Sequence, residues 1–152
     1  MGFRRAALGA TLVFVLCAVA LSAKGETVRL TVVGPGLSAP IDVIDPAALA
    51  SVWAGRFIGR AATEPDKSLP RYVVTFVVQP PRQQQARPMY VVMFARDRES
   101  GRGFVYLPGP GQNGYRMNVS TILREGQDGH WHEASPDWSD ALAQRISERR
   151  VH

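Results

Sequence analysis

Hydrophobic residues along this chain fall into short runs, and turn-forming residues separate one run from the next. Most runs are rich in β-branched and aromatic residues, as in Tyr72 to Val78 (YVVTFVV) and Tyr90 to Ala95 (YVVMFA). Runs of this composition and length are typical of strands. The pattern therefore predicts strands at residues 27–33, 41–44, 72–78, 90–95, 104–107 and 130–133.

Two segments open with a helix-capping residue followed by proline, at Asp45-Pro46 and at Ser135-Pro136. This pair of residues is typical of a helix start. Apolar residues then recur at helical spacing: Leu49, Val52 and Trp53 in the first segment, and Trp138, Leu142 and Ile146 in the second. We expect Gly55 or Gly59 to end the first helix.

The remaining segments are polar, glycine-rich or proline-rich and predict loops and turns. These are residues 60–70, 80–88, 97–103, 108–114 and 125–129, whereas 115–124 is expected to be extended in part. The elements together predict an α+β fold, in which two helices pack on an antiparallel sheet of about five to seven strands.

The first 23 residues have the pattern of a signal peptide. Arg4 and Arg5 precede an uncharged apolar run at residues 6–23, and small residues end that run. Signal peptidase recognises this order of charge, apolar core and small-residue exit. We expect cleavage after Ala23, with Ala20 as the second choice. That leaves one globular domain at residues 24–152, in the periplasm or secreted.

Other fates of this leader stay open. The apolar run spans residues 6–23, which reaches the lower limit for crossing a bilayer, so it could remain as an inner-membrane anchor. Cys17 raises the alternative of lipidation, although Leu16 stands where a lipobox has a small residue. The Arg4-Arg5 pair also raises twin-arginine export.

Composition narrows the function of the mature domain. Cys17 is the only cysteine and leaves with the leader, so neither a disulfide nor a thiol nucleophile remains. Removing the two leader arginines leaves 16 basic residues against 13 acidic ones, a formal net charge of +3. The nearest approach to a basic cluster, Arg145, Arg149 and Arg150, suits the end of a helix. We therefore expect no nucleic-acid partner.

Several motifs resemble functional sequences but lack the context that their chemistry needs. Gly34 to Ala39 (GPGLSA) matches a dinucleotide-binding fingerprint, yet Pro40 and a predicted strand follow where a helix must begin. His132-Glu133 opens a zincin motif, but Pro136 occupies the place of the second histidine. We therefore expect no cofactor, and the sequence favours a non-enzymatic protein.

His130 and His132 are the main candidates for chemistry. On a strand, alternate residues share a face, so the two imidazoles would project together, as they do in zinc or copper sites. A distant carboxylate would have to supply a third ligand, because Glu133 points the other way, with Trp131. A metal-binding protein or a hydrolase centred on this pair is one alternative function.

The loop at residues 107–115 is the candidate for a ligand or partner surface. Stiff prolines and permissive glycines shape this loop, and aromatic residues flank it. The candidate surface residues are Tyr106, Pro108, Pro110, Asn113 and Tyr115. A simple turn is the other interpretation of the same residues.

Three segments, VVGPGLSAPIDVIDP, GFVYLPGPGQNGY and DGHWHEASPDW, resemble small exported bacterial proteins of unknown function. The resemblance covers most of the mature chain through turn and helix-start motifs. It implies an exported bacterial protein, and it transfers no activity, ligand or site residue.

The leading hypothesis from sequence is a non-enzymatic binding or interaction module of the bacterial envelope. Its partner would be an envelope protein or a small ligand, and it would meet a membrane only through a retained leader. A structural subunit of an envelope complex is a further alternative.

Overall fold

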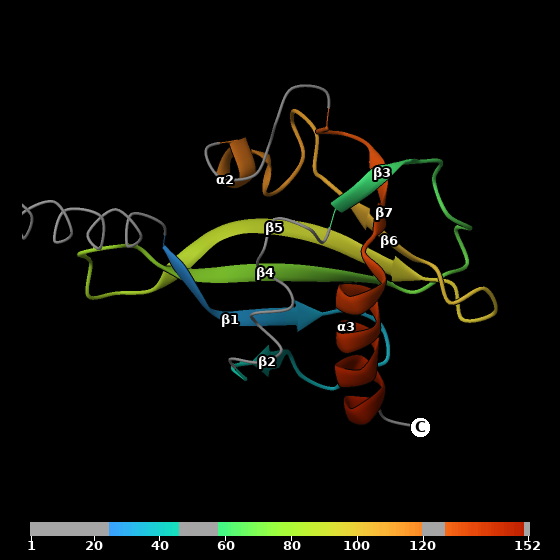
Figure 1. The fold of residues 1–152 in the computed structure, drawn as a ribbon, viewed down its shortest axis with the longest axis horizontal. Coiled ribbons are helices and arrows are strands. Elements are labelled where there is room, and N and C mark those ends of the chain that lie inside the picture. Colours follow the sequence, from blue (N-terminus) through green and yellow to red (C-terminus); the bar gives the residue numbers. More distant parts are fainter. Residues whose placement is uncertain (1–24, 46–57, 120–126, 151–152) are drawn as a thin grey trace, which may run out of the picture.

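The computed structural model describes residues 25–45, 58–119 and 127–150. Within these ranges the chain forms one seven-stranded antiparallel sheet and two helices (Figure 1). This architecture confirms the predicted α+β fold. The predicted leader and the helix predicted after Pro46 lie outside the described residues.

The seven strands follow the spatial order β2-β1-β4-β5-β6-β7-β3, and every neighbouring pair is antiparallel. Their bounds are Glu26–Val33 (β1), Ile41–Val43 (β2), Ile58–Ala62 (β3), Arg71–Gln79 (β4), Arg87–Arg96 (β5), Gly103–Tyr106 (β6) and Trp131–Ala134 (β7). All except β3 coincide with strands that the hydrophobic runs predict.

Strand β3 corrects the sequence prediction, which placed a helix end and a surface loop across residues 58–62. Its residues are mostly exposed and small, so they show no apolar alternation of their own. Pairing with β7 makes this segment a strand, with Ile58 opposite Ala134 and Ala62 opposite Trp131. A side chain at Gly59 would lie 2.9 Å from the Glu133 carbonyl oxygen, so glycine permits this close approach.

Helix α2, Tyr115–Val119, corrects the prediction that residues 115–124 are partly extended. The Asn118 side chain holds this short helix on β5. Its Oδ1 accepts a hydrogen bond from the Val91 N–H at 2.7 Å, and its Nδ2 donates to the Val91 carbonyl at 2.6 Å. Strand β6 pairs with β5 only from Met93 onward, so no β6 residue lies opposite Val91. The Asn118 side-chain amide makes the hydrogen bonds to Val91 that a neighbouring strand would otherwise make.

A smaller correction concerns the loop predicted at residues 80–88. Strand β5 already begins at Arg87, and Pro88 lies opposite Val77, where the register between β4 and β5 shifts. Proline is tolerated at such an irregularity because a regular ladder hydrogen bond is already missing there.

Helix α3, Pro136–Arg149, covers one face of the sheet and runs across the strands (Figure 1). Ser135 is its N-cap as predicted, although the hydroxyl makes no capping hydrogen bond. The predicted apolar stripe is confirmed, because Trp138, Leu142 and Ile146 are all buried. Burial of each such side chain stabilises the fold by about 1.5–3 kcal/mol.

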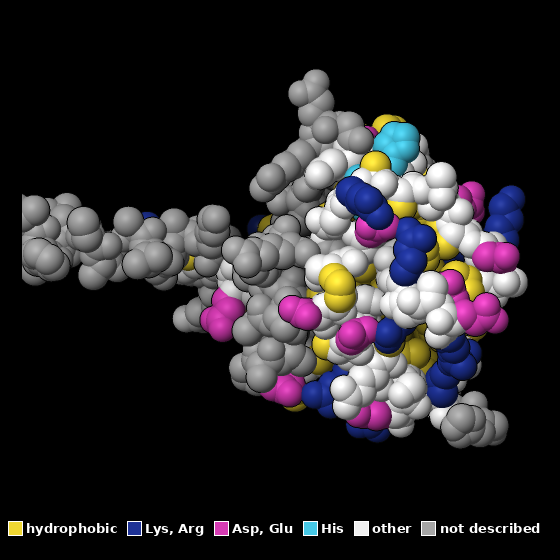
Figure 2. All heavy atoms as spheres, turned by 45° about the vertical axis from the view of Figure 1, so that its right-hand side comes forward, with side chains coloured by type: hydrophobic (Ala, Val, Ile, Leu, Met, Phe, Trp, Pro, Cys, Tyr) yellow, Lys and Arg dark blue, Asp and Glu magenta, His cyan; other side chains and the backbone are white. Residues whose placement is uncertain are grey.

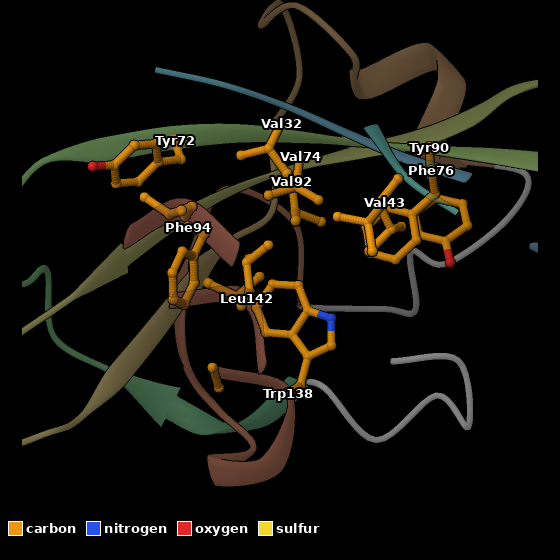
Figure 3. Packing of buried hydrophobic residues seen from close by; sticks show 14 of the residues in the cluster. Val32, Val43, Tyr72, Val74, Phe76, Tyr90, Val92, Phe94, Trp138 and Leu142 are labelled. Carbon is orange, nitrogen blue, oxygen red and sulfur yellow. The ribbon is translucent and has the colours of Figure 1, made fainter. Parts of the chain in front are cut away.

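The main core lies between α3 and the sheet (Figure 3). The Trp138 indole meets the Phe94 ring edge to face, with 5.3 Å between ring centroids. Phe76 and Tyr90 stack beside them at 4.0 Å. Burial raises the pKa of the Tyr90 hydroxyl, so this phenol is neutral at any physiological pH.

The first turn of α3 lies very close to β6. A Cβ placed on Gly103 would overlap the Ser139 hydroxyl and would lie only 2.6 Å from the Ser139 Cβ. Ser139 is itself 1 % exposed, so it has little room to move away. The helix therefore requires glycine at this position of β6.

Candidate functional site

The two histidines differ in their exposure to solvent. His130 is exposed and precedes β7, whereas His132 is 5 % exposed and its Nε2 lies 3.0 Å from the Gln127 carbonyl oxygen. Trp131 is buried in a second apolar cluster, on the sheet face away from α3. Among the residues described, no three histidine, cysteine, aspartate or glutamate side chains form a group that could hold a metal ion.

Glu133 is engaged by two arginines and not by a histidine. It accepts hydrogen bonds from Arg60 at 2.7 Å and from Arg102 at 2.5 Å. Hydrogen bonding to these guanidinium groups lowers the pKa of the Glu133 carboxyl. Glu133 therefore serves as an ion-pair partner that joins β7 to β3 and to the turn before β6.

The loop surface predicted around residues 107–115 is held largely by its own contacts. Gln112 Oε1 accepts hydrogen bonds from the Tyr106 hydroxyl at 2.9 Å and from the Gly109 N–H at 2.7 Å. Pro108 is buried and Tyr115 is half-buried at the start of α2, whereas Pro110 and Asn113 are exposed. These contacts support the turn interpretation, and a binding role for the exposed tip stays a prediction.

A different hollow lies on the surface beside α3. Its lining comes from α3 from Asp140 onward and Arg150 after it, the adjacent ends of β4 and β5, and the start of the turn after β5. We call it the α3 groove. Its volume is about 870 Å³, which falls in the range typical of ligand sites.

The floor of the α3 groove is apolar. Tyr72 from β4, Phe94 from β5 and Ile146 from α3 all line it, and each is largely buried. Figure 2 shows a face of the molecule on which hydrophobic surface, in yellow, is bordered by dark blue Lys and Arg side chains. A ligand with an apolar body would bury surface against such a floor.

The rim of the α3 groove is polar and mostly basic. Gln144 and Ser147 line it from α3, at positions that share a helix face with Asp140 because residues three and four apart are neighbours. Arg96 and Arg98 line it from the end of β5 and the residues that follow.

Arg150 reaches the α3 groove because the chain leaves the helix there. Its backbone is extended, with φ −70° and ψ 131°, and forms an isolated bridge with Leu37. Gly36, in the turn that follows β1, has φ 77°, and a Cβ there would lie 3.1 Å from Arg150 Nε. Glycine at this position therefore leaves room for the guanidinium.

The groove arginines differ in their partners. Arg96 Nη2 donates to Asp140 Oδ1 at 2.6 Å, and Arg96 Nε donates to the Gly101 carbonyl at 3.3 Å. Arg98 and Arg150 form no ion pair with any described residue, and Asp140 is the one carboxylate that lines the groove. Among the described residues, the groove therefore has an excess of positive charge, with two guanidinium groups that no described carboxylate compensates.

This groove was not predicted from the sequence. Arg150 was predicted only as a helix-end cation, and Arg98 lies in a segment predicted to be a turn. The available signal was the polar row Asp140, Gln144 and Ser147, which recurs at helical spacing opposite the apolar stripe.

No protein-family model, curated protein or solved structure matches this chain. The described part of the chain contains no helix that is both long enough and apolar enough to cross a membrane.

Proposed function

We propose that this protein is an exported, non-enzymatic binding module of the bacterial envelope, and that it holds an anionic ligand in the α3 groove. The observation behind the proposal is the combination of an apolar floor with a rim of three arginines and one carboxylate. Guanidinium groups bind carboxylates through two parallel hydrogen bonds, which favours them where such a group is recognised.

The floor and the rim would act on different parts of the ligand. An apolar body would lie against Tyr72, Phe94 and Ile146, but these side chains are at most 5 % exposed, so they add only a modest part of the affinity. The uncompensated charges of Arg98 and Arg150 would select anions over cations and speed their association.

Export is proposed from the N-terminal pattern of Arg4, Arg5 and the apolar run at residues 6–23. We expect protein produced from the full-length gene in a bacterium to begin at Lys24, because signal peptidase cleaves after small residues. Intact-mass measurement of the periplasmic fraction checks this. Full-length protein in the cytoplasmic fraction would contradict export, and full-length protein in the inner membrane would indicate a retained anchor.

The groove is tested with anilinonaphthalene sulfonate, a fluorescent anion with an apolar body. We expect this dye to bind the processed protein. We expect the Arg150→Glu substitution to weaken that binding about tenfold, which corresponds to about 1.4 kcal/mol. Unit charges about 4 Å apart near a protein surface interact by about 1–4 kcal/mol, which spans this value. Fluorescence titration at an ionic strength of about 0.1 M measures the dissociation constant, since charges more than about 10 Å away are then screened.

The matched control is Arg87→Glu, which makes the same change in net charge at the opposite end of β5 from Arg96. We expect it to leave the affinity within about twofold, because screening weakens charge effects beyond about 10 Å. Equal weakening by both variants would mean that only net charge matters, and it would overturn the groove as the site.

A further inference from the structure

The two uncompensated arginines lie at opposite ends of the α3 groove. Arg98 follows two residues after Arg96, which pairs with Asp140 near the start of α3. Arg150 directly follows the last residue of α3. Ten residues separate Asp140 from Arg150, and a helix rises 1.5 Å per residue, so the backbone positions at the two ends are about 15 Å apart.

The middle of the groove offers a different chemistry from its ends. Tyr72, Phe94 and Ile146 provide the apolar floor, and Gln144 and Ser147 stand along the α3 side. Gln144 Nε2 already donates to Glu148 Oε1 at 3.1 Å, and the Ser147 hydroxyl donates to the Gln144 carbonyl at 3.1 Å. Their side-chain oxygens still have acceptor capacity, which suits the backbone N–H groups of an extended segment.

A compact anion does not fit this distribution of charge. A phosphate or a small dicarboxylate is much shorter than this backbone separation, so we expect it to occupy one end of the groove and leave the other arginine without a partner. An extended peptide advances about 3.3 Å per residue, so four to five residues cover this distance.

Resting on the proposed binding function, we infer that the α3 groove binds an extended acidic peptide segment of a partner protein. The segment has an acidic side chain at each end and an apolar side chain between them. One end pairs with Arg98 and the other with Arg150, while the central side chain packs on Tyr72 and Phe94. The Arg96–Asp140 pair borders the groove without competing, because its charges already compensate each other.

The test compares three blocked, fluorescently labelled pentapeptides in anisotropy titrations with the processed protein. Glu-Ala-Leu-Ala-Glu carries an acid at each end, Glu-Glu-Leu-Ala-Ala carries the same charge at one end, and Gln-Ala-Leu-Ala-Gln carries none. We expect the first to bind at least about tenfold more tightly than either of the others, since each added ion pair contributes tenfold per 1.4 kcal/mol. Equal affinity for the first two peptides would overturn the inference.

Reversing the charge of one groove arginine tests whether that arginine pairs with one acidic end of the peptide. Arg150→Glu should weaken binding of Glu-Ala-Leu-Ala-Glu about tenfold and should favour a peptide in which one terminal glutamate is replaced by lysine. Arg98→Glu should act in the same way, and Arg87→Glu should change neither affinity. An Arg150→Glu protein that still prefers the doubly acidic peptide would overturn the inference. Circular dichroism melting of each variant confirms that the fold is intact.

The outcomes separate this inference from the proposed function. If anilinonaphthalene sulfonate binds in the groove but the protein shows no preference among the peptides, the proposed binding function is supported and the peptide ligand is contradicted. Displacement of the labelled peptide by equimolar citrate would also remove it, because a compact anion would then suffice. Failure of both probes would remove the proposed function itself.

Discussion

Replacing Asn118 with alanine should lower the free energy of unfolding by about 2–4 kcal/mol, because an unsatisfied backbone group costs about 1–3 kcal/mol. The substitution removes both hydrogen bonds to Val91 and frees α2 from β5. Asn118 is fully buried, so its side chain also leaves a small void. Urea unfolding followed by tryptophan fluorescence measures the change.

The Asn118→Asp variant distinguishes these hydrogen bonds from simple packing. An ionised carboxylate can accept from the Val91 N–H, but it repels the Val91 carbonyl oxygen. Burial beside that oxygen raises the pKa of the introduced carboxyl in the folded state. The folded state then binds more protons than the unfolded state, so stability falls as the pH rises. We therefore expect the deficit relative to wild type to shrink between pH 7 and pH 4, and a constant deficit would contradict this account.

The second large effect is expected at Gly103. Alanine at this position would overlap Ser139, and overpacking a buried contact costs about 1–3 kcal/mol. Because α3 carries much of the core, the whole fold should lose this stability. Thermal melting and urea unfolding of Gly103→Ala measure the loss.

A double-mutant cycle checks the cause at Gly103. Adding Ser139→Gly removes the side chain that alanine would meet, although glycine within a helix itself costs about 0.5–1 kcal/mol. We expect the double variant to be more stable than the sum of the two single effects implies. Additive losses would mean that the helix and strand do not clash there. Gly111→Ala is the comparison, because a Cβ at Gly111 meets no described atom within 4 Å, although its φ of 83° adds backbone strain.

Elements with a strong internal signal were predictable from the sequence. The β-branched runs of β4 and β5 form strands because their own residues favour a pleated, half-buried surface. Helix α3 begins where Ser135-Pro136 predicts, and its apolar stripe is buried. In each of these cases the local preference and the tertiary contacts agree.

Elements defined by a distant partner were not predictable. Strand β3 exists because β7 pairs with it, and Ile58 meets Ala134 across 76 residues of sequence. Helix α2 is only five residues long and depends on the contact of Asn118 with Val91. Neither contact produces a periodic pattern that a single sequence could reveal.

The α3 groove escaped prediction for the same reason. Arg98 and Arg150 come to line the same groove only after α3 has packed across β4 and β5. Each arginine alone has an ordinary explanation, as a turn residue or a helix-end cation. The histidines show the opposite error, because their alternate spacing on a predicted strand suggested a common site, whereas the fold buries His132 and exposes His130.

The strand order constrains how this molecule can be assembled. Strands β4, β5 and β6 follow one another along the chain and pair with their sequence neighbours, so their hairpins can form early. Strand β3 is synthesised before all of them, yet its partner β7 is the last strand to be made. Until β7 arrives, the unpaired backbone of β3 is open to wrong partners, including another nascent copy. We therefore expect completion of the C-terminal segment to protect the newly made chain from misassembly.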